Sequence, residues 1–276
     1  NVRILADEKE DVRRATKRIF QLCRELGITI NESEDEASTP KQQYTYLGIA
    51  FDHSRKTVDI TEKARTKIAA AAKVLEEESA STEEWVSLFS RCVWTSTILN
   101  IDRSEKYYVY KFCRRKLNGD NCETVKLWPS IRDIWKNWVS EVVNSFPRVV
   151  APRLPKYTVY TDASLSGFGG VIFGEEGDTV IAGAWSMEEH INLLELKAVR
   201  RVLERWDVKG PVDVKVVMDS TSAIGQIRRG YARRFASNEE VKRLKKFLMH
   251  KGINISSIEY ITSAMNPADK PSRIHN

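Results

Sequence analysis

Residues His190 to Trp206 read HINLLELKAVRRVLERW, and the fold of the C-terminal half is decided by this stretch. Its apolar residues recur at helical spacing, and Glu195 begins the apolar stripe that continues through Val199 and Val202. A carboxylate on a core-facing stripe needs a partner or a function. Two structural explanations are open: a favourable place near the start of the helix, or an ion pair with a basic neighbour in the core.

Composition limits the class of protein. The chain has 276 residues, of which 42% are hydrophobic, which is enough for two domains with their own cores. The net charge of +6 is unevenly placed: residues 103–156 contain 12 basic and 5 acidic residues, and residues 226–251 contain 9 and 2. These two basic segments indicate contact with a polyanion such as a nucleic-acid backbone. The alternative for either segment is a solvated charged surface.

The cysteines and the apolar segments indicate where the protein works. Cys23, Cys92, Cys113 and Cys122 form no CxxC pair, and no His or Cys nearby completes a zinc site. They are typical of reduced thiols, so we expect an intracellular protein, nuclear or cytoplasmic. No apolar run has membrane-spanning length and no signal peptide is visible, so we expect no membrane partner. The missing initial Met suggests a piece of a longer chain.

The first 150 residues are predicted to be mainly helical with one β-hairpin. YTYLGIAFD and KTVDIT have the composition of two paired strands, while ITI (28–30) suggests a short strand and NESEDEASTP (31–40) a loop. The motif STEEW is a capping box that begins a helix. Three prolines between 147 and 155 mark a linker and a domain boundary. Helices are expected over 11–26, 62–78, 82–99, 106–116 and 130–145.

Beyond the linker the pattern changes. The expected order is three strands, the helix that contains Glu195, a strand, further helix, a strand, and a last helix that starts at NPADKPSR. This order predicts a mixed α/β sheet covered by helices.

Three more acids are placed at the ends of these elements. Asp162 ends the strand YTVYTD, Asp219 ends VDVKVVMD, and Asp269 lies at the last junction between loop and helix. Side chains at the carboxyl ends of strands converge above an α/β sheet, so two of these acids can meet there. Each acid taken alone could instead be a turn residue or a helix cap.

Four clustered acids without a histidine base suggest metal chemistry. Carboxylates that lie together repel one another unless cations neutralise them, and hard oxygen ligands select Mg²⁺ or Mn²⁺. Two such ions about 4 Å apart can activate a water and stabilise the leaving oxygen in phosphodiester cleavage. The basic segments would then hold the nucleic acid.

These residues carry a family resemblance. YTDAS with GFGGVIF, then LLELKAV, VVMDSTSAI and NPADKPSR resemble the ribonuclease H domain of retroelement reverse transcriptases, over about residues 157–273. The separations between the four acids, 33, 24 and 50 residues, suit that family. GAWSMEEHINLLELKAV is most similar to tyrosine-recombinase retrotransposons of the DIRS type, and NPADKPSR is also similar to hepadnaviral polymerases. The resemblance implies a ribonuclease H fold with a mixed five-stranded sheet, and an RNA:DNA hybrid as the partner.

The resemblance also implies roles for single residues. Asp162 would bridge two Mg²⁺ or Mn²⁺ ions, Glu195 and Asp219 would complete one site, and Asp269 would complete the other. Gly167 and Gly169 would let the backbone approach the sheet edge. Relatives often carry a histidine in the loop before the last acid, and here that loop, ITSAMN, has none. The implied substrate contacts are Ser164, Gly167, Asn192, Ser220, Arg228, Arg229, Arg233, Arg234 and Arg273.

The N-terminal half resembles another part of a reverse transcriptase. YLGIAFD followed by TVDIT and a long helix is similar to the primer grip and thumb. NVRILA resembles the strand after the polymerase YxDD turn, with Asn1 at its second Asp, so we predict no DNA synthesis by this chain. The upstream palm and fingers of the same polyprotein are the implied partner. An unrelated helical domain is the alternative. The implied domains are 1–61, end of the palm and primer-grip hairpin; 62–102, thumb; 103–156, basic connection and linker; and 157–276, ribonuclease H.

The sequence therefore predicts an endoribonuclease that cuts the RNA strand of an RNA:DNA hybrid with two metal ions. The alternative is a domesticated or non-catalytic scaffold that keeps the fold and binds nucleic acid without cutting it. A two-metal nuclease or integrase acting on DNA is a third possibility, which the thumb-like region disfavours.

Overall fold

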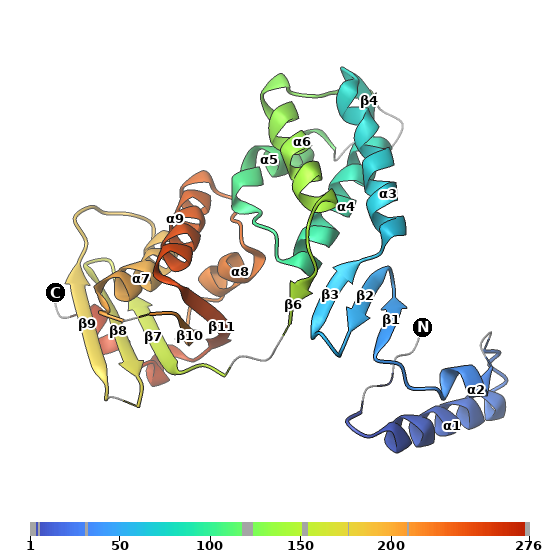
Figure 1. The fold of residues 1–276 in the computed structure, drawn as a ribbon. Helices are drawn as coiled ribbons and strands as arrows, with labels where there is room; N and C mark the ends of the chain where they lie inside the picture. Colours follow the sequence, from blue (N-terminus) through green and yellow to red (C-terminus); the bar gives the residue numbers. More distant parts are fainter. Residues whose placement is uncertain are drawn as a thin grey trace.

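A computed structural model describes residues 4, 6–30, 33–117, 124–150, 154–175, 177–208 and 210–273. Figure 1 shows an α/β domain formed by the C-terminal part of the chain beside a helical domain, with a small sheet and helix α1 beyond it. The predictions for Asn1 and Cys122 lie outside the described residues.

The C-terminal domain is built on a mixed five-stranded sheet in the order β11-β10-β7-β8-β9. Strands β7, β8 and β9 are consecutive antiparallel neighbours, while β10 runs parallel to both β7 and β11. This is the mixed sheet that the sequence predicts. The strands are β7 (Tyr157–Ala163), β8 (Gly167–Phe173), β9 (Thr179–Ala184), β10 (Val212–Met218) and β11 (Ile253–Tyr260).

Two adjacent glycines of β8 show which helices cover which face of this sheet. A Cβ added to Gly170 would lie 2.4 Å from the side chain of Val202 in α7, whereas one added to Gly169 would lie 2.4 Å from the backbone nitrogen of Ser272 in α10. Successive strand residues face opposite sides, so α7 and α10 cover opposite faces. Helices α8 and α9 pack beside α7. The helices are α7 (Ile191–Arg205), α8 (Thr221–Arg229), α9 (Phe235–Lys251) and α10 (Asp269–Ser272).

The helical domain has one core, built around three fully buried tryptophans, Trp85, Trp135 and Trp138. Residues from both the predicted thumb segment and the predicted connection segment fill it. The predicted capping box is present, because Ser81 accepts from the N–H of Glu84 and Glu84 reaches back to Ser81. The elements are α3 (Glu62–Ala71), the 3₁₀ helix η1 (Ala72–Glu76), β4 (Ser79–Ser81), α4 (Thr82–Leu99), η2 (Ser104–Lys106), α5 (Tyr107–Lys116), β5 (Thr124–Lys126) and α6 (Pro129–Val143).

The N-terminal sheet contains the predicted hairpin and two further strands. A turn at Leu47 and Gly48, both with positive φ, divides the run YTYLGIAFD into two strands. The proline-rich linker also contributes a short edge strand, β6, paired with β3. The result is an antiparallel sheet in the order β1-β2-β3-β6. Its strands are β1 (Gln43–Tyr46), β2 (Ile49–Asp52), β3 (Thr57–Ile60) and β6 (Arg148–Val149).

Two short predictions in this region are wrong. The ITI segment is not a strand, because the N–H of Ile28 donates to the carbonyl of Cys23 and closes the end of helix α1 (Lys9–Glu25), with Gly27 in the left-handed region. The acidic segment contains a helical turn, α2 (Glu34–Ala37), because Ser33 caps it and its three acids lie in the first turn. The predicted helix over 62–78 also ends early, at Ala71, and continues as η1.

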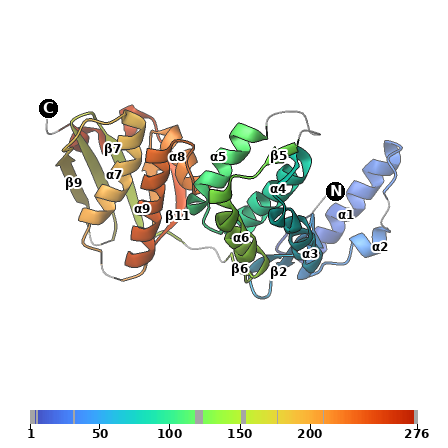
Figure 2. The ribbon, with the colours of Figure 1, turned by 90° about the horizontal axis from the view of Figure 1, so that it is seen from above.

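The two domains meet through α9, and Figure 2 shows α8 and α9 lying next to α5 and α6. Asn238 of α9 is fully buried there and donates to the backbone carbonyl of Ser104 at 2.7 Å. The ring of Tyr231 stacks on that of Tyr110 with centroids 4.1 Å apart. Side chains from both domains therefore form one packed junction.

Within the part of the chain that the structure describes, none of the helices combines the length and the apolar composition that crossing a bilayer requires.

Candidate metal centre

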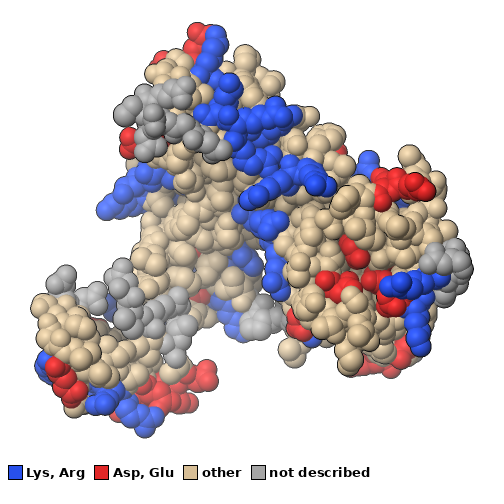
Figure 3. Space-filling view, turned by 180° about the vertical axis from the view of Figure 1, so that it is seen from behind, with Lys and Arg blue, Asp and Glu red and all other residues tan. Residues whose placement is uncertain are grey.

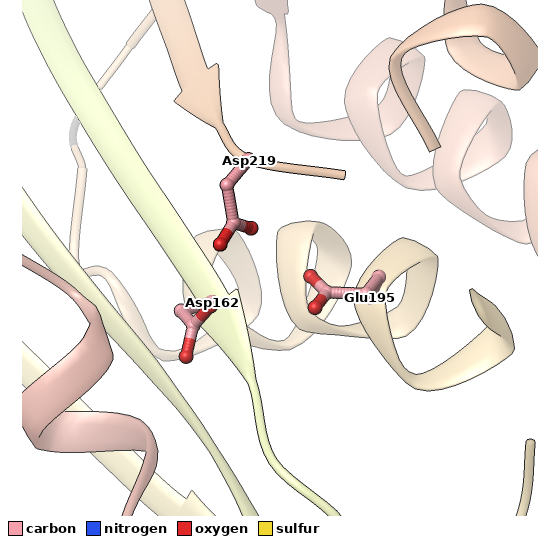
Figure 4. Close-up of side chains that lie close together, drawn as sticks. All are labelled: Asp162, Glu195 and Asp219. Carbon is pink, nitrogen blue, oxygen red and sulfur yellow. The ribbon is translucent and has the colours of Figure 1, made fainter. Parts of the chain in front are cut away.

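Three acids from three different elements meet at the carboxyl end of the central strands. Asp162 lies in β7, Asp219 directly follows β10, and Glu195 lies in α7 (Figure 4). One carboxylate oxygen from each lies within 4.8 Å of the others. Strands β7 and β10 are parallel neighbours, so the acids at their ends share one edge of the sheet. The apolar stripe of α7 packs on β7 and β8 and carries Glu195 to the same edge.

Two of the three carboxylates are poorly solvated. Asp162 is 4% exposed and Glu195 is 8% exposed, whereas Asp219 is partly exposed. Burial first, and then the neighbouring charges of Asp162 and Asp219, raise the pKa of Glu195 to about 8, against the lowering effect of the N–H of Ala163. The pKa of Asp162 is also raised, first by burial and then by the charges of Asp219 and Asp269, against the lowering effect of Ser272.

Glu195 has an oxygen with no partner. Its Oε2 is buried and forms no hydrogen bond with any described residue. A buried carboxylate oxygen without a donor costs free energy, and the two nearest charged groups of the site are acids that increase this cost. Neither structural explanation offered for this residue is found. Glu195 is the fifth residue of α7, which has no acid in its first turn, and it forms no ion pair with a basic residue in the described part of the chain. The set has the donor atoms and the unbalanced charge that suit a hard divalent cation.

Asp269, the fourth predicted ligand, lies beside this set rather than within it. It is the first residue of α10, and its Oδ1 accepts from Arg273 Nη2 at 2.6 Å and from Arg273 Nε at 3.1 Å. Its charge still raises the pKa of Asp162. The guanidinium of Arg273 is the partner of an acid here, rather than a free phosphate contact.

Three residues that contact the acids or the backbone beside them were not predicted. The hydroxyl of Ser272 donates to Asp162, and the hydroxyl of Ser263 donates to Asp219. Asn266 is buried, and its side chain donates to the carbonyl of Thr161 at 3.0 Å while accepting from the N–H of Ala268 at 3.2 Å. The sequence predicted that the last helix starts at NPADKPSR, but the helix begins at Asp269. Asn266 instead attaches the last loop to β7.

Two of the predicted substrate contacts, Ser164 and Gly167, lie in the turn that follows Asp162 or next to it. The hydroxyl of Ser164 donates to the carbonyl of Ser272 at 2.7 Å and accepts from the N–H of Gly167 at 2.9 Å. Gly167 is buried at the start of β8. A close backbone approach was predicted for Gly167 and Gly169. It is found at Gly169, where the backbone of Ala268 and Ser272 packs against β8 and brings α10 against the sheet.

Two further predicted contacts lie at helix starts on the same edge of the sheet. Asn192 is exposed in the first turn of α7, three residues before Glu195, and its N–H donates to the ring of His190. Ser220 follows Asp219 and caps α8 by accepting from the N–H of Ala223.

The four arginines of the second basic segment lie at the end of α8 and the start of α9. Arg229, Arg233 and Arg234 are exposed, and the backbone carbonyl of Arg233 accepts from the side chain of Arg114 in the helical domain at 3.3 Å. Arg228 donates to the carbonyl of Ile258 in β11. The structure thus places this group at the domain junction and does not bring it to the acids.

Comparison with known proteins gives no match to a family model and none to a curated protein. Among solved structures, the chain is similar to LC11 ribonuclease H1 in complex with an RNA/DNA hybrid (23% identity, 42% of this chain and 93% of that one, TM-score 0.34). It is also similar to an N-terminal ribonuclease H domain from Mycobacterium tuberculosis (16% identity, 42% and 94%, TM-score 0.35). A foamy viral protease-reverse transcriptase in complex with an RNA/DNA hybrid matches at 12% identity over 94% of this chain, which spans 34% of that chain (TM-score 0.41).

The C-terminal domain is a mixed five-stranded sheet with covering helices, as the sequence predicts, and the N-terminal part is helical with a β-hairpin sheet.

Proposed function

We propose that this chain is an endoribonuclease that cuts the RNA strand of RNA:DNA hybrids, as part of a retroelement reverse transcriptase. The observation that carries the proposal is the buried, unpartnered Oε2 of Glu195 beside Asp162 and Asp219. Holding three acids together has a cost in folding free energy that a bound cation would offset. This cost is typical of a site kept for catalysis rather than for stability.

The residues present fit a divalent cation. Asp162, Glu195 and Asp219 supply oxygen ligands, and Asp269 would join them once Arg273 released it. When bound, a pair of Mg²⁺ or Mn²⁺ ions supplies Lewis-acid activation of the attacking water and of the leaving oxygen. The chain itself holds three carboxylates close together where α7 meets the ends of β7 and β10, and its basic surface would hold the phosphodiester backbone.

The distribution of charge supports a nucleic-acid substrate. Figure 3 shows Lys and Arg gathered in a band over the helical domain that reaches the junction with the C-terminal domain, on the same face as a group of acidic side chains. Positive charge along such a surface attracts a phosphate backbone. A hybrid carries 2′-hydroxyls on one strand only, so a site that reads shape can direct cleavage to the RNA.

We assign the segments 1–61, 62–102, 103–156 and 157–276 to the end of the palm, the thumb, the connection and the ribonuclease H domain. The antiparallel sheet beside a helical domain supports this assignment. The upstream palm and fingers of the same polyprotein are the proposed partner. The resemblance to DIRS-type elements stays a prediction, since none of the comparisons bears on it.

The test is cleavage of labelled substrates by the purified chain. We expect Mg²⁺ or Mn²⁺ to support cutting of the RNA strand in an RNA:DNA hybrid, and we expect EDTA to stop it. Single-stranded RNA, double-stranded RNA and double-stranded DNA should remain intact. Hybrid binding without any cutting, in either metal, would contradict the proposal and favour the scaffold alternative. Cutting of the DNA duplex would favour the third possibility, a DNA nuclease.

One observation favours the scaffold alternative. The pairing of Asp269 with Arg273 leaves three carboxylates close together instead of four. Calorimetric titration with Mn²⁺ separates the two functions, because two bound ions require that Arg273 release Asp269. One ion, or none, would favour a nucleic-acid-binding module.

A further inference from the structure

We infer that Ser272 is a positioning residue, which orients the carboxylate of Asp162 for cation binding. The inference deepens the proposed function and rests on it for the identity of the ligand. Ser272 is 0% exposed, and its Oγ lies 2.5 Å from Oδ2 of Asp162, a residue 110 positions earlier in the chain. The distance is in the range of a charge-assisted hydrogen bond between a hydroxyl and a carboxylate.

The proton of this hydroxyl has two possible acceptors. Oγ of Ser272 also lies 2.8 Å from the backbone carbonyl of Asp269, in its own helix. A hydroxyl has one proton, and an ionised carboxylate is a stronger acceptor than a backbone carbonyl. The proton is therefore directed to Asp162 whenever that acid is charged, which is the state in which it binds a cation.

The serine is itself held from three sides. Its carbonyl accepts from the hydroxyl of Ser164 at 2.7 Å, and its N–H donates to the carbonyl of Ala268 at 3.1 Å. Gly169 of β8 packs so closely that an added Cβ would lie 2.4 Å from the nitrogen of Ser272. Asp162 and Gly169 are direct partners across β7 and β8, so both lie on the face that α10 covers. The donor is fixed before any ligand arrives.

The consequence for Asp162 is a fixed orientation. Oδ2 is occupied by Ser272, while Oδ1 accepts no hydrogen bond from any residue that the structure describes. A partner that orients a ligating group in this way is typically worth 10- to 100-fold in metal affinity or activity. Ser263 donates to Asp219 in the same manner, but it is exposed, so water can replace its hydroxyl.

The experiment measures Mn²⁺ affinity by calorimetry, without substrate. Ser272→Ala should weaken binding by about 10- to 100-fold, whereas Ser272→Thr, which keeps the hydroxyl, should restore most of it. Ser256→Ala is the matched control, because Ser256 in β11 donates to the carbonyl of Val214 and not to an acid. Ser263→Ala should give a smaller loss than Ser272→Ala. Where alanine lowers the melting temperature below that of the assay, Ser272→Cys replaces it, since a thiol is a much weaker donor.

A double variant shows whether the serine acts through Asp162. In the Asp162→Asn background, adding Ser272→Ala should change Mn²⁺ affinity no further. Unchanged Mn²⁺ affinity in Ser272→Ala, or an equal loss with and without Asp162→Asn, would overturn the inference. If the unaltered chain cuts hybrids while Ser272→Ala binds Mn²⁺ normally, the inference alone fails. If Ser272→Ala loses Mn²⁺ affinity and the unaltered chain cuts nothing, the proposed function alone fails.

Discussion

Two glutamates of the C-terminal domain are buried to a similar extent in different surroundings. Glu240 of α9 is 1% exposed, and its two oxygens pair with Nε and Nη2 of Arg200 in α7. Glu195 lies in the same helix, five residues before Arg200. Its charged neighbours are acids, and its Oε2 has no hydrogen-bond partner among the described residues. The chain neutralises one buried charge internally and leaves the other without a basic partner, where we propose that a cation binds. On that proposal, the difference separates a residue kept for the fold from one kept for chemistry.

The largest effect that the comparison predicts is on cleavage. Glu195→Gln would remove a proposed cation ligand but keep the size of the side chain. The expected cost of several kcal/mol in transition-state stabilisation corresponds to about a 10³-fold or greater loss in kcat. Because the unpartnered charge disappears, thermal unfolding should shift to higher temperature or stay unchanged. Hybrid cleavage and calorimetric melting measure the two effects. Cleavage retained within tenfold would remove Glu195 from the metal site.

The second prediction reverses this result at the other glutamate. Glu240→Ala leaves the guanidinium of Arg200 buried with Glu204 as its remaining partner, which should cost about 3 kcal/mol of unfolding free energy. Activity per folded molecule, measured well below the melting temperature, should fall only a few-fold. The double change Arg200→Met with Glu240→Leu should recover most of the lost stability. A large loss of kcat in folded Glu240→Ala would mean that the pair serves the reaction as well.

The third prediction concerns pH. The pKa of Glu195 is about 8 in the folded chain without cation and near 4.5 when unfolded, so the folded state binds more protons between these values. This group therefore contributes stability that is fully present below pH 4.5 and is lost as the pH rises through 8. We expect the melting temperature to fall over this window, and both Glu195→Gln and saturating Mg²⁺ should flatten the decline. Melting curves from pH 5 to pH 9 test this, and a decline that persists unchanged in Glu195→Gln would assign it to another group.

The sequence contained the acids but not all of their partners. Strand ends and the helical stripe were enough to place Asp162, Asp219 and Glu195 at one edge of a sheet, because strand and helix periodicity decide which way side chains face. The hydrogen bond between Ser272 and Asp162 joins residues 110 positions apart, and no local pattern reports such a contact. The pairing of Asp269 with Arg273 lies within one turn of helix and could have been expected from its spacing of four residues.

The N-terminal half shows the same limit more strongly. The capping box at Ser81 could be predicted because all of its residues are close in sequence. The edge strand β6 could not be predicted, since two residues of a proline-rich linker become a strand only by pairing with β3. The packing of the two domains could not be predicted either. Nothing in the sequence around Asn238 indicates that its side chain pairs with the backbone of Ser104.

Asn238 extends the comparison to a buried polar group without charge, and predicts the smallest effect. Its amide donates to Ser104 and accepts from the N–H of Ala232 at 3.1 Å, so both of its sides are satisfied. Asn238→Ala leaves two buried backbone groups, the N–H of Ala232 and the carbonyl of Ser104, without a hydrogen-bond partner. This should cost about 1 to 3 kcal/mol of unfolding free energy. Asn254→Ala removes an exposed amide that pairs with Asp213 and should change stability by less than about 0.5 kcal/mol. Mn²⁺ affinity should be the same in both variants, because neither contacts the acids. If Asn238→Ala lowered the Mn²⁺ affinity, the domain junction would help to hold Glu195 in place. Residues of α9 could then not be divided into those that serve the fold and those that serve the chemistry.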